Sequence, residues 1–250
     1  MYFKGGTSLS KGWGLINRFS EDIDITFNAH IGESRRKKLK NIVLKGISEQ
    51  LEMPIINWED TQSDRDYNAY LFSYVSVFDS MGDWLPQYVK LEISLGSYAF
   101  PTQTVEIQNY IGDYLEMRGK KEYAGQFCLD RFNMNLQSLD RTYIDKVFAL
   151  CDYYLQGKSK RYSRHLYDIY KLTPFMKYND EFRDLYDEVR DHRAKMKICP
   201  SAQPDVDVSA LIRAIIEKRI YKDDYDSITS RILEEDVPYD TAVEALSIIA

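Results

Sequence analysis

The sequence predicts an α+β protein in which a mixed α/β half is followed by an all-helical half. In the first half, short runs with alternating or continuous apolar residues, typical of strands, are interspersed with helical segments. After about residue 138 the apolar residues recur every three to four positions, which is typical of amphipathic helices. We therefore divide the chain into an α/β domain over residues 1–138 and a helical domain over residues 139–250.

Periodicity defines the elements of the first half. "DIDITF" alternates polar and apolar residues as a half-buried strand does, whereas "RKKLKNIVLKGISEQLE" has helical spacing. The turn-rich "DSMGDWLPQ" separates two strand-like runs. The predicted strands are residues 1–5, 22–27, 70–77, 88–95, 104–108 and 132–137, and the predicted helices are residues 7–17 and 33–52.

The second half contains amphipathic segments separated by polar or proline-bearing joints such as "ICPSAQPD". We expect helices over residues 140–156, 163–176, 180–196, 207–221 and 239–249.

Composition restricts the class of protein. The chain has 250 residues, a net charge of -6 and 44% hydrophobic residues, as an ordinary globular protein does. No apolar run approaches the roughly 18–20 residues that span a bilayer, so we expect no membrane association. Three cysteines without CxxC spacing favour the reducing cytoplasm over a disulfide framework. The negative charge argues against indiscriminate binding of polyanions, although it leaves room for a local basic face.

A glycine pair lies between the first predicted strand and the first predicted helix. Gly5 and Gly6 allow close backbone approach, and free N–H groups at a helix start suit a phosphate. Thr7 and Ser8 add hydroxyl donors, and Lys11 lies one turn further on. The alternative is a plain strand–helix turn.

Two acids follow on the next strand. Asp22 and Asp24 are two residues apart, so both carboxylates project from one face while Ile23 and Ile25 point into the core. A divalent cation would relieve their repulsion, and Mg²⁺ (or Mn²⁺) takes one or two carboxylates together with substrate phosphate oxygens. The alternative is a solvated strand face.

A third acid would complete the metal site. "VKLEISL" buries its apolar residues on one face and turns Glu92 to the other, so we prefer Glu92, with Glu106 in "TVEIQ" as the competing choice. Glu92 would bind a second metal ion and help to deprotonate the attacking hydroxyl.

The stretch "FKGGTSLSKGWGLINRFSEDIDI" resembles the signature of the AbiEii/AbiGii-type nucleotidyltransferases. These are bacterial toxins of type IV toxin–antitoxin and abortive-infection systems, within the DNA polymerase β-like nucleotidyltransferase superfamily. "LDRTYIDKVFAL", "SRHLYDIYKL" and "KDDYDSITSRIL" resemble later family segments in the same order. The resemblance implies a polymerase β-like domain with a mixed sheet, followed by a helical domain. Relatives with helices before the first strand leave open whether the natural chain extends upstream.

The resemblance also implies the reaction, in which a nucleoside monophosphate passes from an NTP to an acceptor and pyrophosphate is released. Its expected site is Gly5, Gly6, Thr7 and Ser8 around the triphosphate, Asp22, Asp24 and Glu92 on the metal ions, Lys146 on the triphosphate, and Asp168 near that lysine, where it orients the lysine or assists in catalysis.

Without the family resemblance, Lys146, Asp168 and Arg18 have simpler interpretations. Lys146 would lie on a solvated helix face, and Asp168 would pair along its helix with Arg164 or Lys171. Arg18 would pair with a phosphate or brace Glu21.

The distribution of basic residues and the family resemblance indicate the acceptor and the partners. Basic clusters at residues 35–38 and 158–165 could hold an RNA backbone, although plain solubility explains either cluster as well. We prefer a tRNA 3′ end over a protein hydroxyl as acceptor, and the family implies a cognate antitoxin. The alternatives are a non-catalytic nucleotide- or partner-binding module on the same fold, or a nucleotidyltransferase of small molecules. No histidine has a Ser or Cys partner at a recognisable spacing.

Overall fold

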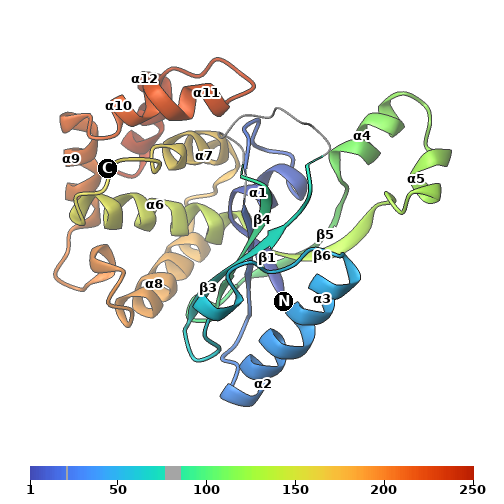
Figure 1. The fold of residues 1–250 in the computed structure, drawn as a ribbon. Helices are drawn as coiled ribbons and strands as arrows, with labels where there is room; N and C mark the ends of the chain where they lie inside the picture. Colours follow the sequence, from blue (N-terminus) through green and yellow to red (C-terminus); the bar gives the residue numbers. More distant parts are fainter. Residues whose placement is uncertain (21, 77–85) are drawn as a thin grey trace. The chain divides into compact units, whose positions relative to one another are not determined.

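The structure is a computed structural model that describes residues 1–20, 22–76 and 86–250. The chain forms two compact units (Figure 1): residues 1–12 with 20–136, and residues 13–19 with 137–250. The second unit takes segment 13–19 together with the residues from 137 onward. That segment belongs to the helical unit although it lies early in the sequence.

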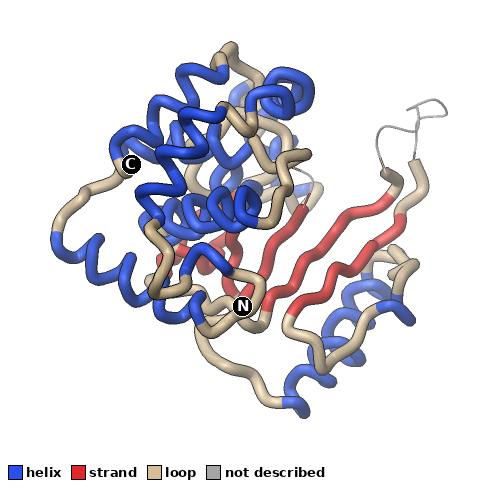
Figure 2. The backbone as a smooth tube through the Cα atoms, turned by 90° about the vertical axis from the view of Figure 1, so that its left-hand side faces the viewer, coloured by secondary structure: helices blue, strands red, loops and turns tan. Residues whose placement is uncertain are grey.

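The first unit is built on a mixed sheet, whose strands are red in Figure 2. The strand order is β3-β4-β2-β1-β6-β5. Its strands are β1 (Tyr2–Lys4), β2 (Asp22–Thr26), β3 (Tyr67–Ser73), β4 (Tyr88–Ser94), β5 (Thr102–Ile107) and β6 (Phe132–Gln137). β2 runs antiparallel to β1 and parallel to β4, and β3 runs antiparallel to β4. The alternating side chains of the central strands bury Phe3, Ile25 and Ile93. The α/β character of this part of the chain is confirmed.

Each predicted strand is present, with small shifts of its ends. The largest shift is in the strand predicted over residues 70–77, which begins at Tyr67 and ends at Ser73. Residue 77 and most of the predicted turn that follows it lie outside the described residues.

The helices of the first unit differ more from the prediction. They are α1 (Gly5–Lys11), α2 (Glu33–Lys38), the π-helical η1 (Leu39–Leu44), α3 (Lys45–Gln50), the 3₁₀ turn η2 (Trp58–Asp60), α4 (Tyr110–Met117) and α5 (Glu122–Gln126). The helix predicted over residues 7–17 is wrong at both ends. It begins at Gly5 and stops at Lys11, because Gly14 has a φ of 62° and the chain there leaves the right-handed helical conformation.

The predicted helix over residues 33–52 is present as α2, η1 and α3 in direct succession, seen as one rod in Figure 1. Its predicted apolar face is only partly buried. Ile42, Val43 and Leu51, which the helical spacing places on that face, are exposed, and the buried Leu44 lies outside it. A π-helical stretch has a wider turn than an α-helix, so the spacing of 3.6 residues does not identify the packed side chains there. The pattern also gave no indication of α4 and α5, which are short.

The second unit is helical. Its elements are α6 (Leu139–Leu155), α7 (Arg164–Leu172), η3 (Thr173–Phe175), α8 (Asp180–Ala194), η4 (Pro200–Ala202), α9 (Val208–Lys218), α10 (Lys222–Asp224), η5 (Tyr225–Thr229), α11 (Ser230–Ile232), α12 (Tyr239–Glu244) and η6 (Ala245–Ile248). Side-chain caps at Ser138, Asn179 and Asp207 fix the starts of α6, α8 and α9. Leu150, Leu166 and Ile215 are fully buried between the helices. Across the described residues, no helix combines the length and the apolar character needed to cross a membrane.

Candidate active site

A row of charged side chains lies on one face of the central strands of the first unit. Strands β2 and β4 are parallel, and their register places Asp22 beside Lys90 and Asp24 beside Glu92. Residues two apart on a strand share a face, so all four side chains project to the same side of the sheet. The carboxyl groups of Asp24 and Glu92 lie within hydrogen-bonding reach of each other. We call these four residues the carboxylate face.

Strand order separates the two candidates for the third acid. Glu92 lies on β4, the direct neighbour of β2, whereas Glu106 lies on the edge strand β5, beyond β1 and β6. Glu106 is also exposed. The structure therefore brings Glu92, and not Glu106, next to Asp24.

Lys90 is an unexpected member of this face. Its ammonium lies 3.5 Å from the carboxylate of Asp22 and forms an ion pair with Glu92. Burial disfavours the charged form of Lys90, but the two carboxylates outweigh this and raise its pKa. Burial likewise opposes ionisation of Glu92, and the lysine outweighs it and lowers the pKa of Glu92. Both groups are therefore ionised at neutral pH.

Tyr67 at the start of β3 approaches the same face from the other side of β4. Its hydroxyl donates a hydrogen bond to the Glu92 carboxylate. Burial, followed by the negative charge of Glu92, raises the pKa of Tyr67, so its hydroxyl stays protonated and remains a donor. Glu92 is thus held between a lysine and a tyrosine.

The first glycine of the pair is fitted to this face. Lys4 is the register partner of Asp24 across β1 and β2, and the chain turns into α1 at the next residue, Gly5. Gly5 has a φ of 74°, and a Cβ at this position would overlap the Asp24 carboxylate. A side chain at residue 5 would therefore strain the backbone and displace Asp24.

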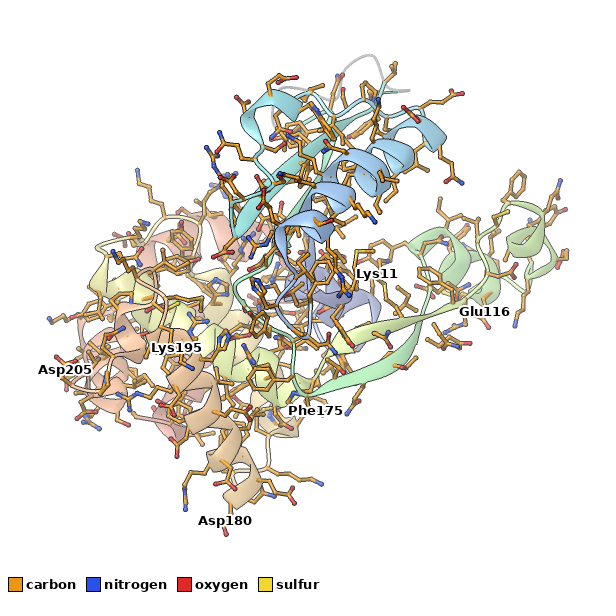
Figure 3. All side chains as sticks on the ribbon, turned by 90° about the horizontal axis from the view of Figure 1, so that it is seen from below. Lys11, Glu116, Phe175, Asp180, Lys195 and Asp205 are labelled. Atoms are coloured by element: carbon orange, nitrogen blue, oxygen red, sulfur yellow. The ribbon has the colours of Figure 1, made fainter. Side chains whose placement is uncertain are left out.

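The other residues expected around a triphosphate are engaged within the unit. The Thr7 hydroxyl donates to the carbonyl oxygen of Asp22 at 2.5 Å, which joins α1 to β2. Ser8 is fully buried, and its hydroxyl donates to the carbonyl oxygen of Gly5 at 2.9 Å. The ammonium of Lys11, labelled in Figure 3, lies over the ring of Tyr110 at the start of α4. Gly6 is half-buried in the first turn of α1. Their contacts to a nucleotide stay predictions.

A second group of charged residues lies inside the helical unit. Asp168 on α7 is fully buried and accepts two hydrogen bonds from the guanidinium of Arg18, at 2.6 and 2.7 Å. The same carboxylate accepts a bond of 2.6 Å from the ammonium of Lys146 on α6. Neither Arg164 nor Lys171 pairs with Asp168 in the described part of the chain, and Lys146 is buried, so both simpler interpretations are wrong.

The electrostatics of this cluster follow from burial and pairing. Burial opposes ionisation of Asp168, but Arg18 and Lys146 outweigh it and hold the pKa of that carboxyl well below its usual range. Burial lowers the pKa of the Lys146 ammonium, with Asp168 opposing. Arg18 therefore braces Asp168 and joins segment 13–19 to the helices. The alternative partner Glu21 lies outside the described residues.

The carboxylate face fits a hard divalent cation in chemistry, since Asp22, Asp24 and Glu92 offer only oxygen ligands. The spacing of these three carboxylates is less suited to a metal ion. Within residues 1–20, 22–76 and 86–250, no three Asp, Glu, His or Cys side chains form a group that could hold a metal ion. Two of the three carboxylates are instead engaged by Lys90. Metal binding would therefore require Lys90 to release at least one of them.

Several contacts were not predicted from the sequence. Lys90 is not among the site residues that the sequence predicts. Strand alternation in "YVKLEISL" turns Lys90 to the same face as Glu92. The parallel pairing of β4 with β2 then places the Asp22 carboxylate beside the lysine as well. Tyr67 and the Arg18–Asp168 pair carry no comparable local signal, because their partners lie on other elements far along the chain.

A comparison with known protein families supports the resemblance that the sequence motifs indicate. The family model described as nucleotidyl transferase AbiEii toxin, type IV TA system, matches residues 1–245. Searches of curated proteins and of solved structures found no match. The match extends over both units and includes the glycine pair, the carboxylate face and the buried Lys146–Asp168 pair. The chain belongs to the AbiEii family, the nucleotidyltransferase toxins of type IV toxin–antitoxin systems.

Proposed function

We propose that this protein transfers a nucleoside monophosphate from an NTP to an acceptor hydroxyl in a Mg²⁺- or Mn²⁺-dependent reaction. The observation that carries the proposal is the register of β2 and β4, which places Asp24 beside Glu92 with Gly5 packed against Asp24. Family membership supplies the type of reaction. A bound divalent ion would neutralise charge on the phosphates and on the attacking oxygen.

The residues of the chain position the reactants in this proposal. The acceptor oxygen forms a bond to the α-phosphorus while the bond from that phosphorus to the bridging oxygen breaks, and pyrophosphate leaves. The hydroxyl proton passes to the Glu92 carboxylate, which is ionised and held by Tyr67. Asp22, Asp24 and Glu92 would hold the metal ions. We assign the triphosphate to the segment of Gly5, Gly6, Thr7, Ser8 and Lys11, in which the space beside the Gly5 Cα is filled by the Asp24 carboxylate.

The buried cluster of the helical unit supports the family reading of Lys146 and Asp168. A lysine that is buried and hydrogen-bonded to a carboxylate has a fixed position, as a triphosphate ligand needs. We assign the triphosphate to Lys146 and the orientation of that lysine to Asp168, with Arg18 bracing the carboxylate.

We prefer an RNA acceptor, a tRNA 3′ end, over a protein hydroxyl. Lys37 pairs with Glu33 one turn earlier in α2. Arg35 and Lys38 are exposed on α2, and cations at a helix start oppose the helix dipole, so helix stability alone does not account for these two. Their favourable interaction would be with phosphates. The toxin would act in the bacterial cytoplasm, where NTPs are found, and a cognate antitoxin would restrain it.

The test is transfer of label from each of the four α-labelled NTPs, with Mg²⁺ and total RNA or cell extract. We expect label in RNA, its loss on chelation with EDTA, and a fall of about 100-fold or more in Glu92→Gln, the range for loss of a catalytic acid or base. Glu106→Gln is the matched control, because it removes an exposed acid from the same sheet. Absence of transfer with every nucleotide, or equal activity in Glu92→Gln, would contradict the proposal. For the toxin role, induction in a bacterial host should arrest growth, and Asp22→Ala should relieve the arrest.

A further inference from the structure

The Lys90 ammonium occupies a position among the acids of the carboxylate face that a metal ion would need. It lies 3.5 Å from Asp22 on the neighbouring strand and is paired with Glu92 on its own strand. The three side chains are only 17–32% exposed. Water therefore screens these charges less than it screens charges on an open surface.

The charges on this face make Lys90 and a metal ion competitors. When all three acids are ionised, they and the ammonium carry a net charge of -2. Without the ammonium, three negative charges would repel one another in a half-buried site, so Lys90 stabilises the face when no metal is bound. A divalent cation placed among the same acids would be repelled by Lys90 and would find Asp22 and Glu92 already paired.

Glu92 has a second contact that does not depend on the lysine. The Tyr67 hydroxyl, on β3, donates to its carboxylate. Removal of the Lys90 ammonium would therefore leave Glu92 held in place beside Asp24. The four carbons of the lysine side chain allow the ammonium to move away without movement of β4.

We propose that Lys90 is the resident counter-ion of the carboxylate face, and that a divalent cation binds only by displacing its ammonium from Asp22 and Glu92. The proposal rests on the proposed function. Lys90 weakens binding of a free metal ion, and the metal enters together with the nucleotide, whose phosphate oxygens supply further ligands and negative charge. Lys90 is thus a positioning residue that couples metal binding to binding of the NTP.

The test measures Mn²⁺ binding to the full chain by calorimetry without nucleotide, in the wild type, Lys90→Met and Lys90→Gln. We expect the Mn²⁺ dissociation constant to fall about tenfold in both variants, which corresponds to loss of one competing interaction of about 1.4 kcal/mol. We also expect a lower melting temperature without metal, and a larger rise on addition of Mn²⁺ than in the wild type. Lys45→Met is the matched control, because it removes an exposed ammonium 4.0 Å from Glu49 in the same unit.

A second measurement uses the wild type alone and does not depend on how the variants fold. Lysine acylation followed by mass spectrometry should show faster modification of Lys90 when Mn²⁺ is added, and an unchanged rate at Lys45. Unchanged modification of Lys90, or Mn²⁺ affinity in the variants equal to or weaker than wild type, would overturn the inference. If the wild type transfers label while the variants gain no affinity, only the inference fails. If the variants gain affinity but no chain transfers label, the proposed function fails instead.

Discussion

Gly5 and Asp24 are in direct contact: a Cβ on Gly5 would lie 2.7 Å from the carboxyl carbon of Asp24. This contact links the two motifs at the start of the chain. The glycine follows β1, the aspartate lies on β2, and the antiparallel register of these strands brings them together. Gly5 is therefore required by the carboxylate face, independently of any phosphate.

Gly5→Ala should reduce both stability and nucleotidyl transfer. An alanine in the left-handed region that also meets a carboxylate should cost about 1–3 kcal/mol of unfolding free energy. Displacement of Asp24 should lower the rate of transfer about 100-fold, the cost of a misplaced catalytic group. Urea unfolding and label transfer measure the two effects.

Gly46→Ala is its control. Gly46 lies in α3, and nothing lies within 4 Å of the position of its Cβ. This change should leave transfer intact and stabilise the helix by up to about 1 kcal/mol. Equal activity of the two variants would show that the Gly5–Asp24 contact has no part in the reaction.

Asp168→Asn should destabilise the helical unit strongly. The change leaves the buried Arg18 and Lys146 without their shared negative partner, and loss of one member of a buried ion pair costs about 3–5 kcal/mol. Thermal unfolding should show a marked fall in melting temperature. Asp180→Asn removes a carboxylate of 93% exposure that pairs with Arg183, and it should change stability by less than about 0.5 kcal/mol. A similar small effect for both variants would contradict the assigned role of Asp168.

Stability should fall as the pH drops below about 6.5, the ordinary pKa of histidine. Burial lowers the pKa of His165 well below that value, and the Nδ1 atom has no hydrogen-bond partner in the described part of the chain. The unfolded chain therefore binds a proton that the folded chain does not, so each pH unit below 6.5 costs up to about 1.4 kcal/mol until the folded pKa is reached.

Urea unfolding between pH 7.5 and 5.5 measures this slope. His165→Phe should flatten it, and the part that remains would come from His192, whose pKa is also lowered by burial. His30→Gln, at an exposed position, should leave the slope as in the wild type. An unchanged slope in His165→Phe would exclude His165 as its source.

Tyr67→Phe should lower the rate of transfer without unfolding the protein. A hydrogen bond to a charged group contributes about 1.5–3 kcal/mol, so loss of the hydroxyl that holds Glu92 should reduce the rate at least tenfold. Initial rates of label transfer measure it, with Tyr114→Phe on the exposed face of α4 as control. Wild-type rates in Tyr67→Phe would mean that Glu92 needs no second contact.

The sequence by itself determined the features that depend on local periodicity. The alternation in "DIDITF" and "YVKLEISL" placed Asp22, Asp24 and Glu92 on strand faces opposite the apolar residues, and helical spacing separated the second half from the first. These patterns hold because side chains repeat every two residues in a strand and every 3.6 in a helix. The same rule failed in two places. It did not identify the buried side chains in the π-helical η1, and it did not predict that α1 ends at Lys11.

Only the tertiary structure decided which faces meet. The strand order put β4, and not β5, beside β2, and so selected Glu92 over Glu106. It also placed Lys90 between Asp22 and Glu92, and joined Arg18 to Asp168 across 150 residues of sequence. Such pairings depend on which surfaces are buried together, and no local pattern of residues encodes that choice.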